Sequence, residues 1–205
     1  MFEIEKTLFS CQPVPDEVFL TMQGRSYREN PHISREDLRY LSVSHMGFDG
    51  KAHMGELIVH QLIADEILEI MEVLFEHRYP IEKMRLMDAY NGDDNASMAD
   101  NNSSAFNYRL IAGTDRLSRH SLGLAIDINP LYNPYIRPDG AGGMLIEPPG
   151  SEAFADRSRN FPYKIDEEDL CLKLFQERGY IWGGNWSTVK DYQHFQKLPE
   201  GYKEP

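Results

Sequence analysis

The chain has few cysteines, no long uninterrupted apolar run and a shortage of basic residues, and each absence excludes a class of protein. Two cysteines are too few for a disulfide-rich scaffold, and a single Cys11–Cys171 bond or two free thiols stay equally open. The most apolar segment, residues 56–75, is interrupted by acidic side chains and a histidine, so it cannot span a bilayer. With 21 Lys and Arg against 33 Asp and Glu, the formal net charge is −12, which argues against a nucleic-acid-binding surface.

Length and composition place the chain among ordinary globular proteins. Its 205 residues are 41% hydrophobic and 26% charged, which predicts a single domain over residues 1–205 with a sizeable buried core. The opening segment Met1–Lys6 is already amphipathic and charged, so no signal peptide is predicted there. The sequence predicts no particular oligomeric state.

Periodicity and turn residues predict two helices and an N-terminal arm. Apolar side chains recur at helical spacing over residues 55–77, before Pro80, and a second helix is predicted over 167–178, before Gly179. Residues 1–50 combine short apolar runs with proline and glycine, so we expect an extended, turn-rich arm there, followed by the core over 51–197.

Short strands and loops are predicted for the rest of the chain. Residues 129–150 are rich in proline and glycine, which favours a long loop. A turn is predicted at 91–95, and strands are predicted over 83–90, 106–112, 122–128, 180–182 and 192–196. These elements together predict an α+β fold, in which a small, mainly antiparallel sheet is flanked by helices.

The strongest chemical signal is a histidine and an aspartate seven residues apart around a glycine. These are His120 and Asp127, and a second histidine, His194, lies near the C-terminus. Two imidazoles and one carboxylate are a known catalytic zinc set, with the fourth position left for water. Asp191 lies three residues before His194, where a general base could reach that water. We therefore interpret the chain as a zinc peptidase.

A purely structural explanation of Asp127 stays open. This aspartate lies in an apolar run, so its charge needs a partner. An ion pair with Arg116, Arg119 or His120 would meet that need without a metal. The remaining histidines lack such surroundings and are interpreted as surface or satisfied core residues: His32, His45, His53, His60 and His77.

The pattern Ser-x-His-x-x-Gly-x-Ala-x-Asp over residues 118–127, followed by acid-x-x-His over 191–194, resembles a known family. It is similar to the zinc D-alanyl-D-alanine carboxypeptidases of the VanY and VanX kind and to the L-alanyl-D-glutamate endopeptidases of phage endolysins. The resemblance extends over roughly residues 51–197. It implies a hedgehog-like and D-Ala-D-Ala-peptidase-like fold, zinc as cofactor and a peptidoglycan-derived peptide as substrate. Such a substrate favours the cell envelope or periplasm if a leader was removed, and otherwise the cytoplasm.

The resemblance also assigns roles to single residues. It implies that His120, Asp127 and His194 are the zinc ligands and that Asp191 is the catalytic base. The arginine that faces the scissile carbonyl in the family matches Arg109, for which Arg116 and Arg119 are competitors. The residue that matches the family's substrate-contacting serine is Ser118. Of the two tryptophans, Trp186 lies in a polar loop and is the better candidate for a substrate rim, whereas Trp182 is expected to pack in the core.

Two questions are left open by the resemblance. The carboxypeptidases usually carry Glu at the position of Asp191, whereas the endolysin endopeptidases carry Asp, so this residue favours cleavage of an L-Ala-D-Glu bond. The alternative function is a non-catalytic, zinc-containing binding module of the hedgehog-like scaffold. Such a module would keep the three ligands and lose the base or the arginine, so the presence of both Asp191 and Arg109 favours an enzyme.

Overall fold

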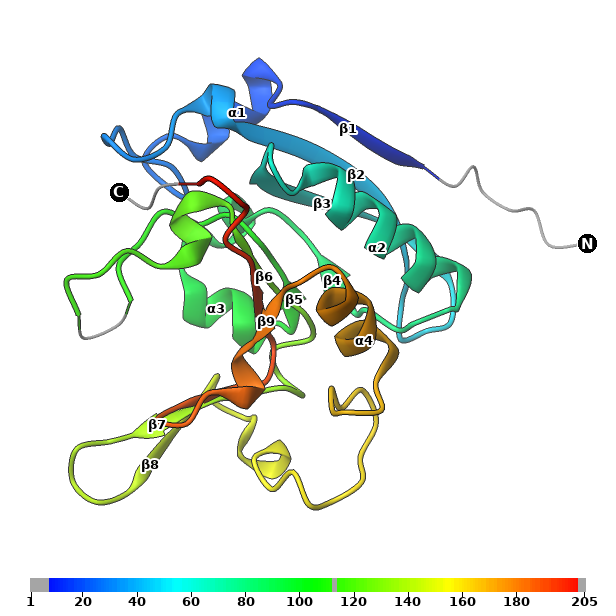
Figure 1. The fold of residues 1–205 in the computed structure, drawn as a ribbon, viewed down its shortest axis with the longest axis vertical. Helices are drawn as coiled ribbons and strands as arrows, with labels where there is room; N and C mark the ends of the chain where they lie inside the picture. The colour runs from blue at the N-terminus through cyan, green and yellow to red at the C-terminus, as the bar shows by residue number, and fades with distance from the viewer. Residues whose placement is uncertain (1–7, 112–113, 203–205) are drawn as a thin grey trace, which may run out of the picture.

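A three-stranded antiparallel sheet with a helix packed against it forms one layer of the molecule (Figure 1). The computed structural model describes residues 8–111 and 114–202. The sheet has the order β1 (Phe9–Pro13), β2 (Leu38–Met46) and β3 (Ala52–His60), and helix α2 (Ala64–Glu76) packs against β1 and β2. The helix buries one face, because Ile67, Ile70, Met71 and Leu74 follow its 3.6-residue period.

The helix predicted over residues 55–77 is correct only from Ala64 onward, because the first part of that segment is strand β3. Leu57 and Val59 lie in the main core, while Ile58 points to a second cluster that contains Phe106. Both faces of β3 are therefore covered. A short apolar run that is buried on both faces has no alternation, so it cannot be told from a buried helix by periodicity.

The extended arm predicted for residues 1–50 is wrong where the structure describes that segment. Residues 8–50 contain β1, β2 and the helix α1 (Asp16–Met22), and β2 is the central strand of its sheet. Leu41 and Val43 of β2 are fully buried. Residues 1–7 of the predicted arm lie outside the described residues.

A second antiparallel sheet, with the order β6, β11 and β9, brings the two ends of the predicted motif together. Its strands are β6 (Ala125–Asp127), β11 (His194–Gln196) and β9 (Ile181–Trp182). They confirm the strands predicted within 122–128, 180–182 and 192–196. His194 pairs with Asp127 in the register, so the pairing of these strands sets a predicted histidine beside a predicted carboxylate. Helix α4 (Leu170–Glu177) confirms the helix predicted over 167–178 and lies beside α2.

The long loop predicted over residues 129–150 is instead a β-hairpin. Strands β7 (Tyr135–Pro138) and β8 (Met144–Glu147) pair with each other, and β7 also pairs with β10 (Lys190–Asp191). The turn closes because Oδ1 of Asp139 accepts hydrogen bonds from the backbone N–H of Ala141 and Gly143. The prolines flank the strands or end them, so they do not break the pairing.

Residues 83–112 contain less strand than predicted. The predicted strand over 83–90 is β4 (Lys83–Met84) followed by the 3-10 helix η2 (Met87–Tyr90), and β4 pairs in parallel with β5 (Asn102–Ser103). Residues 106–111 form no strand, and residue 112 lies outside the described part. The turn predicted at 91–95 ends at Asp93, which caps helix α3 (Asp94–Ala99). The other 3-10 helices are η1 (Arg35–Asp37), η3 (Arg119–Leu122), η4 (Glu152–Phe154) and η5 (Gly183–Asn185).

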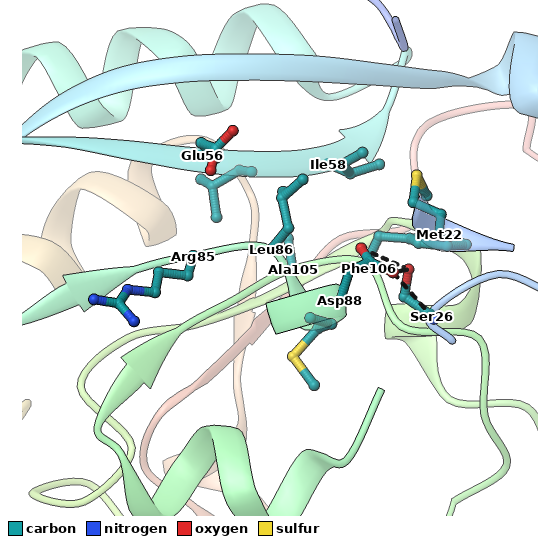
Figure 2. A pocket seen from close by; sticks show the side chains of 11 residues that line it. Met22, Ser26, Glu56, Ile58, Arg85, Leu86, Asp88, Ala105 and Phe106 are labelled. Carbon is teal, nitrogen blue, oxygen red and sulfur yellow. Dashed lines mark hydrogen bonds between the residues drawn. The ribbon is translucent and has the colours of Figure 1, made fainter. Parts of the chain in front are cut away.

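Buried polar residues tie the N-terminal segment to η2, as Figure 2 shows. The Ser26 hydroxyl lies 2.9 Å and 3.1 Å from the two carboxylate oxygens of Asp88, and both residues are buried. The cavity beside them has a volume of about 10 Å³, which is room for one water at most. This contact is therefore a structural anchor and cannot hold a substrate.

The mixed arrangement of small antiparallel sheets and few helices confirms an α+β fold. Cys11 and Cys171 are both free thiols. Among the described residues, no helix combines the length and the apolar character needed to cross a membrane.

Candidate metal centre and cleft

The turn that carries His120 is held by capping interactions at both ends. The Ser118 hydroxyl accepts a hydrogen bond from the backbone N–H of His120 at the start of η3. Gly123 ends η3 with φ +65°, and a Cβ there would lie 2.6 Å from the backbone nitrogen of His60. The Gly123 carbonyl accepts a hydrogen bond from that same N–H at 2.8 Å. Glycine is required here because the turn needs both a left-handed conformation and a close approach to β3.

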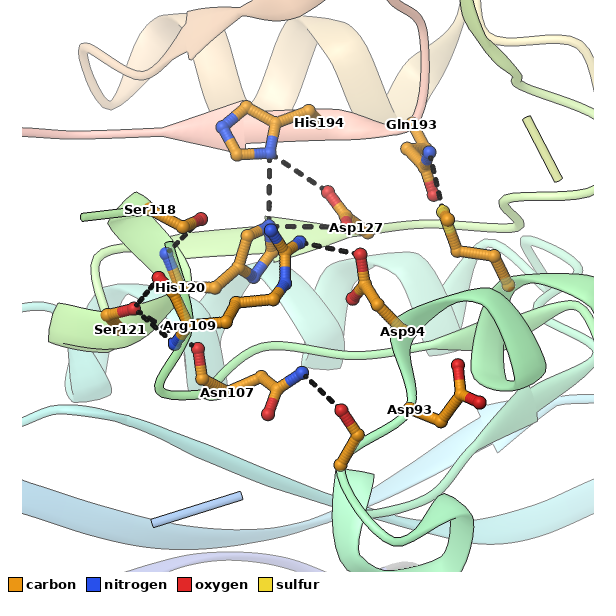
Figure 3. A network of polar contacts seen from close by, with 12 residues as sticks. Asp93, Asp94, Asn107, Arg109, Ser118, His120, Ser121, Asp127, Gln193 and His194 are labelled. Carbon is orange, nitrogen blue, oxygen red and sulfur yellow. Dashed lines mark hydrogen bonds and ion pairs between the residues drawn. The ribbon is translucent and has the colours of Figure 1, made fainter. Parts of the chain in front are cut away.

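His120, Asp127 and His194 meet at one point in the interior (Figure 3). Nε2 of His120 lies 3.2 Å from Oδ2 of Asp127, and Nδ1 of His194 lies 3.0 Å from Oδ1 of the same carboxylate. The two ring nitrogens are 3.1 Å apart. One ligand atom from each residue lies within 4.8 Å of the others, and each residue is at most 5% exposed.

Hydrogen bonds on the far side of each ring determine which nitrogen faces this point. Nδ1 of His120 donates to the Ala105 carbonyl, and Nε2 of His194 donates to the side-chain oxygen of Gln196 at 3.0 Å. The nitrogens left facing Asp127 therefore carry lone pairs in the neutral imidazoles. Outward hydrogen bonds of this kind orient the histidine ligands of metal sites.

The charges in this cluster depend on one another. Burial acts to raise the pKa of Asp127, but the charges and hydrogen bonds of His120 and His194 hold it well below its usual range. Burial acts to lower the pKa of His194, but its hydrogen bond and ion pair with Asp127 raise it to about 9. A positive charge is therefore favoured beside the Asp127 carboxylate, and the raised pKa of His194 reflects this.

The donor set fits zinc. Two imidazole nitrogens and one carboxylate are the ligands of known catalytic zinc sites, which leave a coordination position open. Two lone pairs and a carboxylate that converge in a buried space repel one another unless a cation lies between them. Of the ion-pair partners expected for Asp127 as a structural explanation, His120 is in place, and His194 is a partner that was not expected.

Asp191 is the last residue of β10 and lines the same cleft as this cluster. Burial raises its pKa to about 7, although the charge of His194 lowers it. Its Oδ1 is fully enclosed and has no hydrogen-bond partner. Four buried side-chain polar atoms in the described residues lack a partner, and three of them belong to residues that line one cleft: Arg109, Asp191 and Gln193. Since buried polar groups are normally paired, this concentration makes the cleft a candidate functional site.

The cleft has a volume of about 250 Å³, and the residues predicted to contact the substrate line it. Arg109, Ser118 and Trp186 all line it, and the Trp186 ring lies 5.3 Å from the His194 ring. Arg119 also lines it, so it stays a competitor for the arginine role. Trp182 does not line the cleft; it is buried and donates its indole N–H to the Tyr192 carbonyl, as expected for core packing.

The other histidines do not join the centre. His45 is buried with its Nδ1 on the Ile81 carbonyl, and burial lowers its pKa. His60 is buried beneath Tyr202 and its Nδ1 accepts from the Leu62 N–H. His53 pairs with Asp49 at the surface.

Two of the cleft residues that were not predicted from the sequence contact predicted site residues directly. Gln196 orients His194, and Asp94 forms a 2.7 Å ion pair with Arg109. The spacing of Gln196, two residues after His194 on the same strand face, was a usable signal. Asp94 gave none, because it comes close to Arg109 only through the folding of α3.

Comparisons with known proteins agree with the motif. The family described as "D-alanyl-D-alanine carboxypeptidase" matches residues 112–197, a segment that contains Ser118, Trp186, Asp191 and the His120–Asp127–His194 cluster. Arg109 and Asp94 lie before it. No curated protein and no solved structure matches the chain. Residues 112–197 are therefore similar to the D-alanyl-D-alanine carboxypeptidase family, which is VanY-like.

Proposed function

We propose that this protein is a zinc-dependent peptidase that hydrolyses a peptide bond in the stem peptide of peptidoglycan. The observation that carries the proposal is the convergence of His120, Asp127 and His194 in the lining of a cleft that Asp191 also lines. The family match over residues 112–197 supports it independently.

His120, Asp127 and His194 would hold the zinc ion. When bound, zinc in such a site acidifies its water to a pKa of about 7 and polarises the scissile carbonyl. Asp191 would accept a proton from the attacking water and deliver it to the leaving amine, as general base and then general acid. Its unpartnered Oδ1 supports this role, since no other group of the described residues occupies that oxygen.

The residues of the cleft wall would bind and polarise the substrate. Arg109 would stabilise the negative charge that develops on the carbonyl oxygen, because its buried Nε has no partner in the described structure. Ser118 and Trp186 would contact the peptide. Ser118 also caps the turn of His120, so its substitution would disturb that histidine as well.

Two bonds are candidates for cleavage. The family description favours removal of the terminal D-Ala from D-Ala-D-Ala, whereas aspartate at position 191 favours the L-Ala-D-Glu bond. A zinc-loaded protein incubated with the pentapeptide L-Ala-D-Glu-(diamino acid)-D-Ala-D-Ala decides between them by mass spectrometry. Loss of one D-Ala identifies a carboxypeptidase, and free L-Ala identifies an endopeptidase.

The same experiment tests the proposal as a whole. The zinc-loaded Asp191→Ala variant is the matched control and is expected to release neither product. If the wild-type protein binds one zinc per chain and cleaves neither bond, the function as a stem-peptide hydrolase is wrong. The alternative, a zinc-containing binding module, then gains support.

The wider proposals follow from this function. We propose that residues 1–205 act as one catalytic domain of the hedgehog-like and D-Ala-D-Ala-peptidase-like class. The net charge of −12 supports a peptide substrate over a nucleic acid. The cell envelope is the compartment that a peptidoglycan substrate favours.

A further inference from the structure

Helix α3 forms a wall of the cleft that lies outside the segment matched by the family. Asp94, Asn95 and Met98 of this helix line the cleft together with the residues of the metal centre. Asp94 and Met98 are four residues apart, so they project from the same side of the helix. Met98 contacts the Gln193 side chain through its sulfur at 3.4 Å, and Asp94 contacts Arg109.

The backbone of Arg109 is tied to the turn that carries His120. The Ser121 hydroxyl accepts a hydrogen bond from the Arg109 N–H at 2.8 Å and donates to the Arg109 carbonyl at 2.6 Å. That carbonyl also accepts from the Ser118 N–H at 3.1 Å. The backbone of Arg109 is therefore fixed relative to the candidate metal centre. Its side chain is long, so the guanidinium at its end needs a contact of its own to be held in place.

Asp94 supplies that anchor. Its Oδ2 lies 2.7 Å from Nη2 of Arg109, and the two side chains are 27% and 29% exposed. Figure 3 shows the guanidinium directed toward the Asp94 carboxylate. The ion pair leaves Nε of Arg109 buried and unpartnered. The ion pair uses only Nη2, so the other N–H groups of the guanidinium do not take part in it, and Arg109 lines the cleft.

The start of α3 is itself fixed relative to Arg109. Asn107, two residues before Arg109, donates its side-chain N–H to the Gly92 carbonyl at 3.1 Å. Gly92 has φ +75°, and a Cβ there would lie 2.7 Å from the Arg25 carbonyl oxygen. Asp93 then caps the helix through the Ala96 N–H. These contacts hold the Asp94 carboxylate at a set distance from the arginine.

We propose that Asp94 is a positioning residue that orients Arg109 for the developing charge on the scissile carbonyl. The inference rests on the proposed function, because it takes Arg109 as the residue that faces that carbonyl. A misplacement of about 1 Å in such a group costs on the order of 100-fold in rate.

The first test is steady-state cleavage of the stem peptide by zinc-loaded variants. Asp94→Asn is expected to lower kcat about 10- to 100-fold and to change KM less than about 3-fold, because the orientation matters most in the transition state. Asp94→Glu keeps the charge but shifts the guanidinium, so an intermediate kcat is expected. In an Arg109→Lys background, Asp94→Asn is expected to have little further effect.

Asp93→Asn is the matched control. This substitution removes one negative charge, as Asp94→Asn does, and asparagine is also a good helix cap. Asp93 does not line the cleft. The kcat of this variant is expected to equal that of the wild type, and its melting temperature provides the reference for Asp94→Asn. An Asp94→Asn variant with unchanged or higher kcat would overturn the inference, as would additive effects with Arg109→Lys.

A second readout does not depend on activity. The ¹⁵N-labelled guanidinium of Arg109 is expected to show restricted rotation in the wild type and in Asp93→Asn, and free rotation in Asp94→Asn. Equal mobility in all three proteins contradicts the positioning role. If the wild type cleaves no stem peptide but Asp94→Asn still frees the guanidinium, the proposed function fails while the role of Asp94 in orienting Arg109 stands.

Discussion

Nε2 of His120 and Nδ1 of His194 lie 3.1 Å apart, and each is within 3.2 Å of a carboxylate oxygen of Asp127. Both rings donate their other N–H outward, to Ala105 and Gln196. Two lone pairs so close to a carboxylate form an electron-rich pocket. The three side chains are therefore arranged so that they could hold a cation.

Zinc is expected to bind at one ion per chain and to raise the melting temperature, because the ion binds the folded state alone. His120→Ala and His194→Ala are each expected to lose the ion, whereas His53→Ala, at a surface histidine paired with Asp49, is expected to keep it. Elemental analysis of dialysed protein and thermal melts with and without zinc measure this. Full zinc content in His194→Ala would contradict the ligand set.

Asp191→Asn is expected to keep zinc and to lose turnover by about 10²- to 10⁴-fold, since the amide cannot accept the proton of water. The zinc content is measured on the same sample as the rate. A variant that has lost its zinc would show that Asp191 supports the metal, and the assignment as a base would be wrong.

Gln196→Leu is expected to weaken zinc binding about 10- to 100-fold, because it removes the acceptor that orients the His194 ring. Gln196→Glu keeps an acceptor at the same position and is the control. Competition with a chelator of known affinity gives the zinc dissociation constants of the two variants. Equal affinity in the two variants would show that the ring is held by other contacts.

Gly123→Ala is expected to destabilise the fold by roughly 2–4 kcal/mol, because the new Cβ meets backbone and φ is positive. Gly140→Ala is the control: its φ is also positive, at +79°, but its Cβ would meet no atom within 4 Å. Denaturant unfolding of both variants measures the difference. A similar loss of unfolding free energy in both variants would show that the positive φ alone causes the effect at Gly123, without a contribution from the close approach to β3.

The stability of the protein is expected to depend on the ionisation of Asp169, which caps α4. Burial raises its pKa to about 6 from the ordinary value of 3.8, although the hydrogen bonds from the Leu172 and Cys171 N–H groups lower it. Between pH 3.8 and about pH 6, Asp169 is protonated in the folded protein and ionised in the unfolded chain. The stabilisation that its protonated form gives is therefore complete below pH 3.8 and is lost as the pH rises through about 6.

Asp169→Asn removes this titration and keeps a capping oxygen. The free energy of unfolding of the wild type minus that of the variant is therefore expected to fall by about 1–3 kcal/mol between pH 4 and pH 7. Urea unfolding at several pH values measures the difference. A difference that does not change with pH would contradict the role of Asp169.

Local sequence determined the parts of this protein that depend on neighbours in the chain. The Ser118–Asp127 motif carries its own turn, capped by Ser118 and ended by Gly123, so the place of His120 was predictable. Helix α4 was predictable because Asp169 caps it and its apolar period is regular.

Only the tertiary structure decided the elements whose identity depends on distant partners. Residues 57–59 are strand because β2 lies beside them, and the same apolar run would also suit a buried helix. The pairing of β6 with β11 brings Asp127 to His194 across 67 positions of sequence. The anchoring of Arg109 by Asp94 likewise depends on how α3 packs, because a charged pair leaves no periodic signal in the sequence. The sequence by itself thus determined which chemical groups are present, and the packing of strands and helices decided which of them meet.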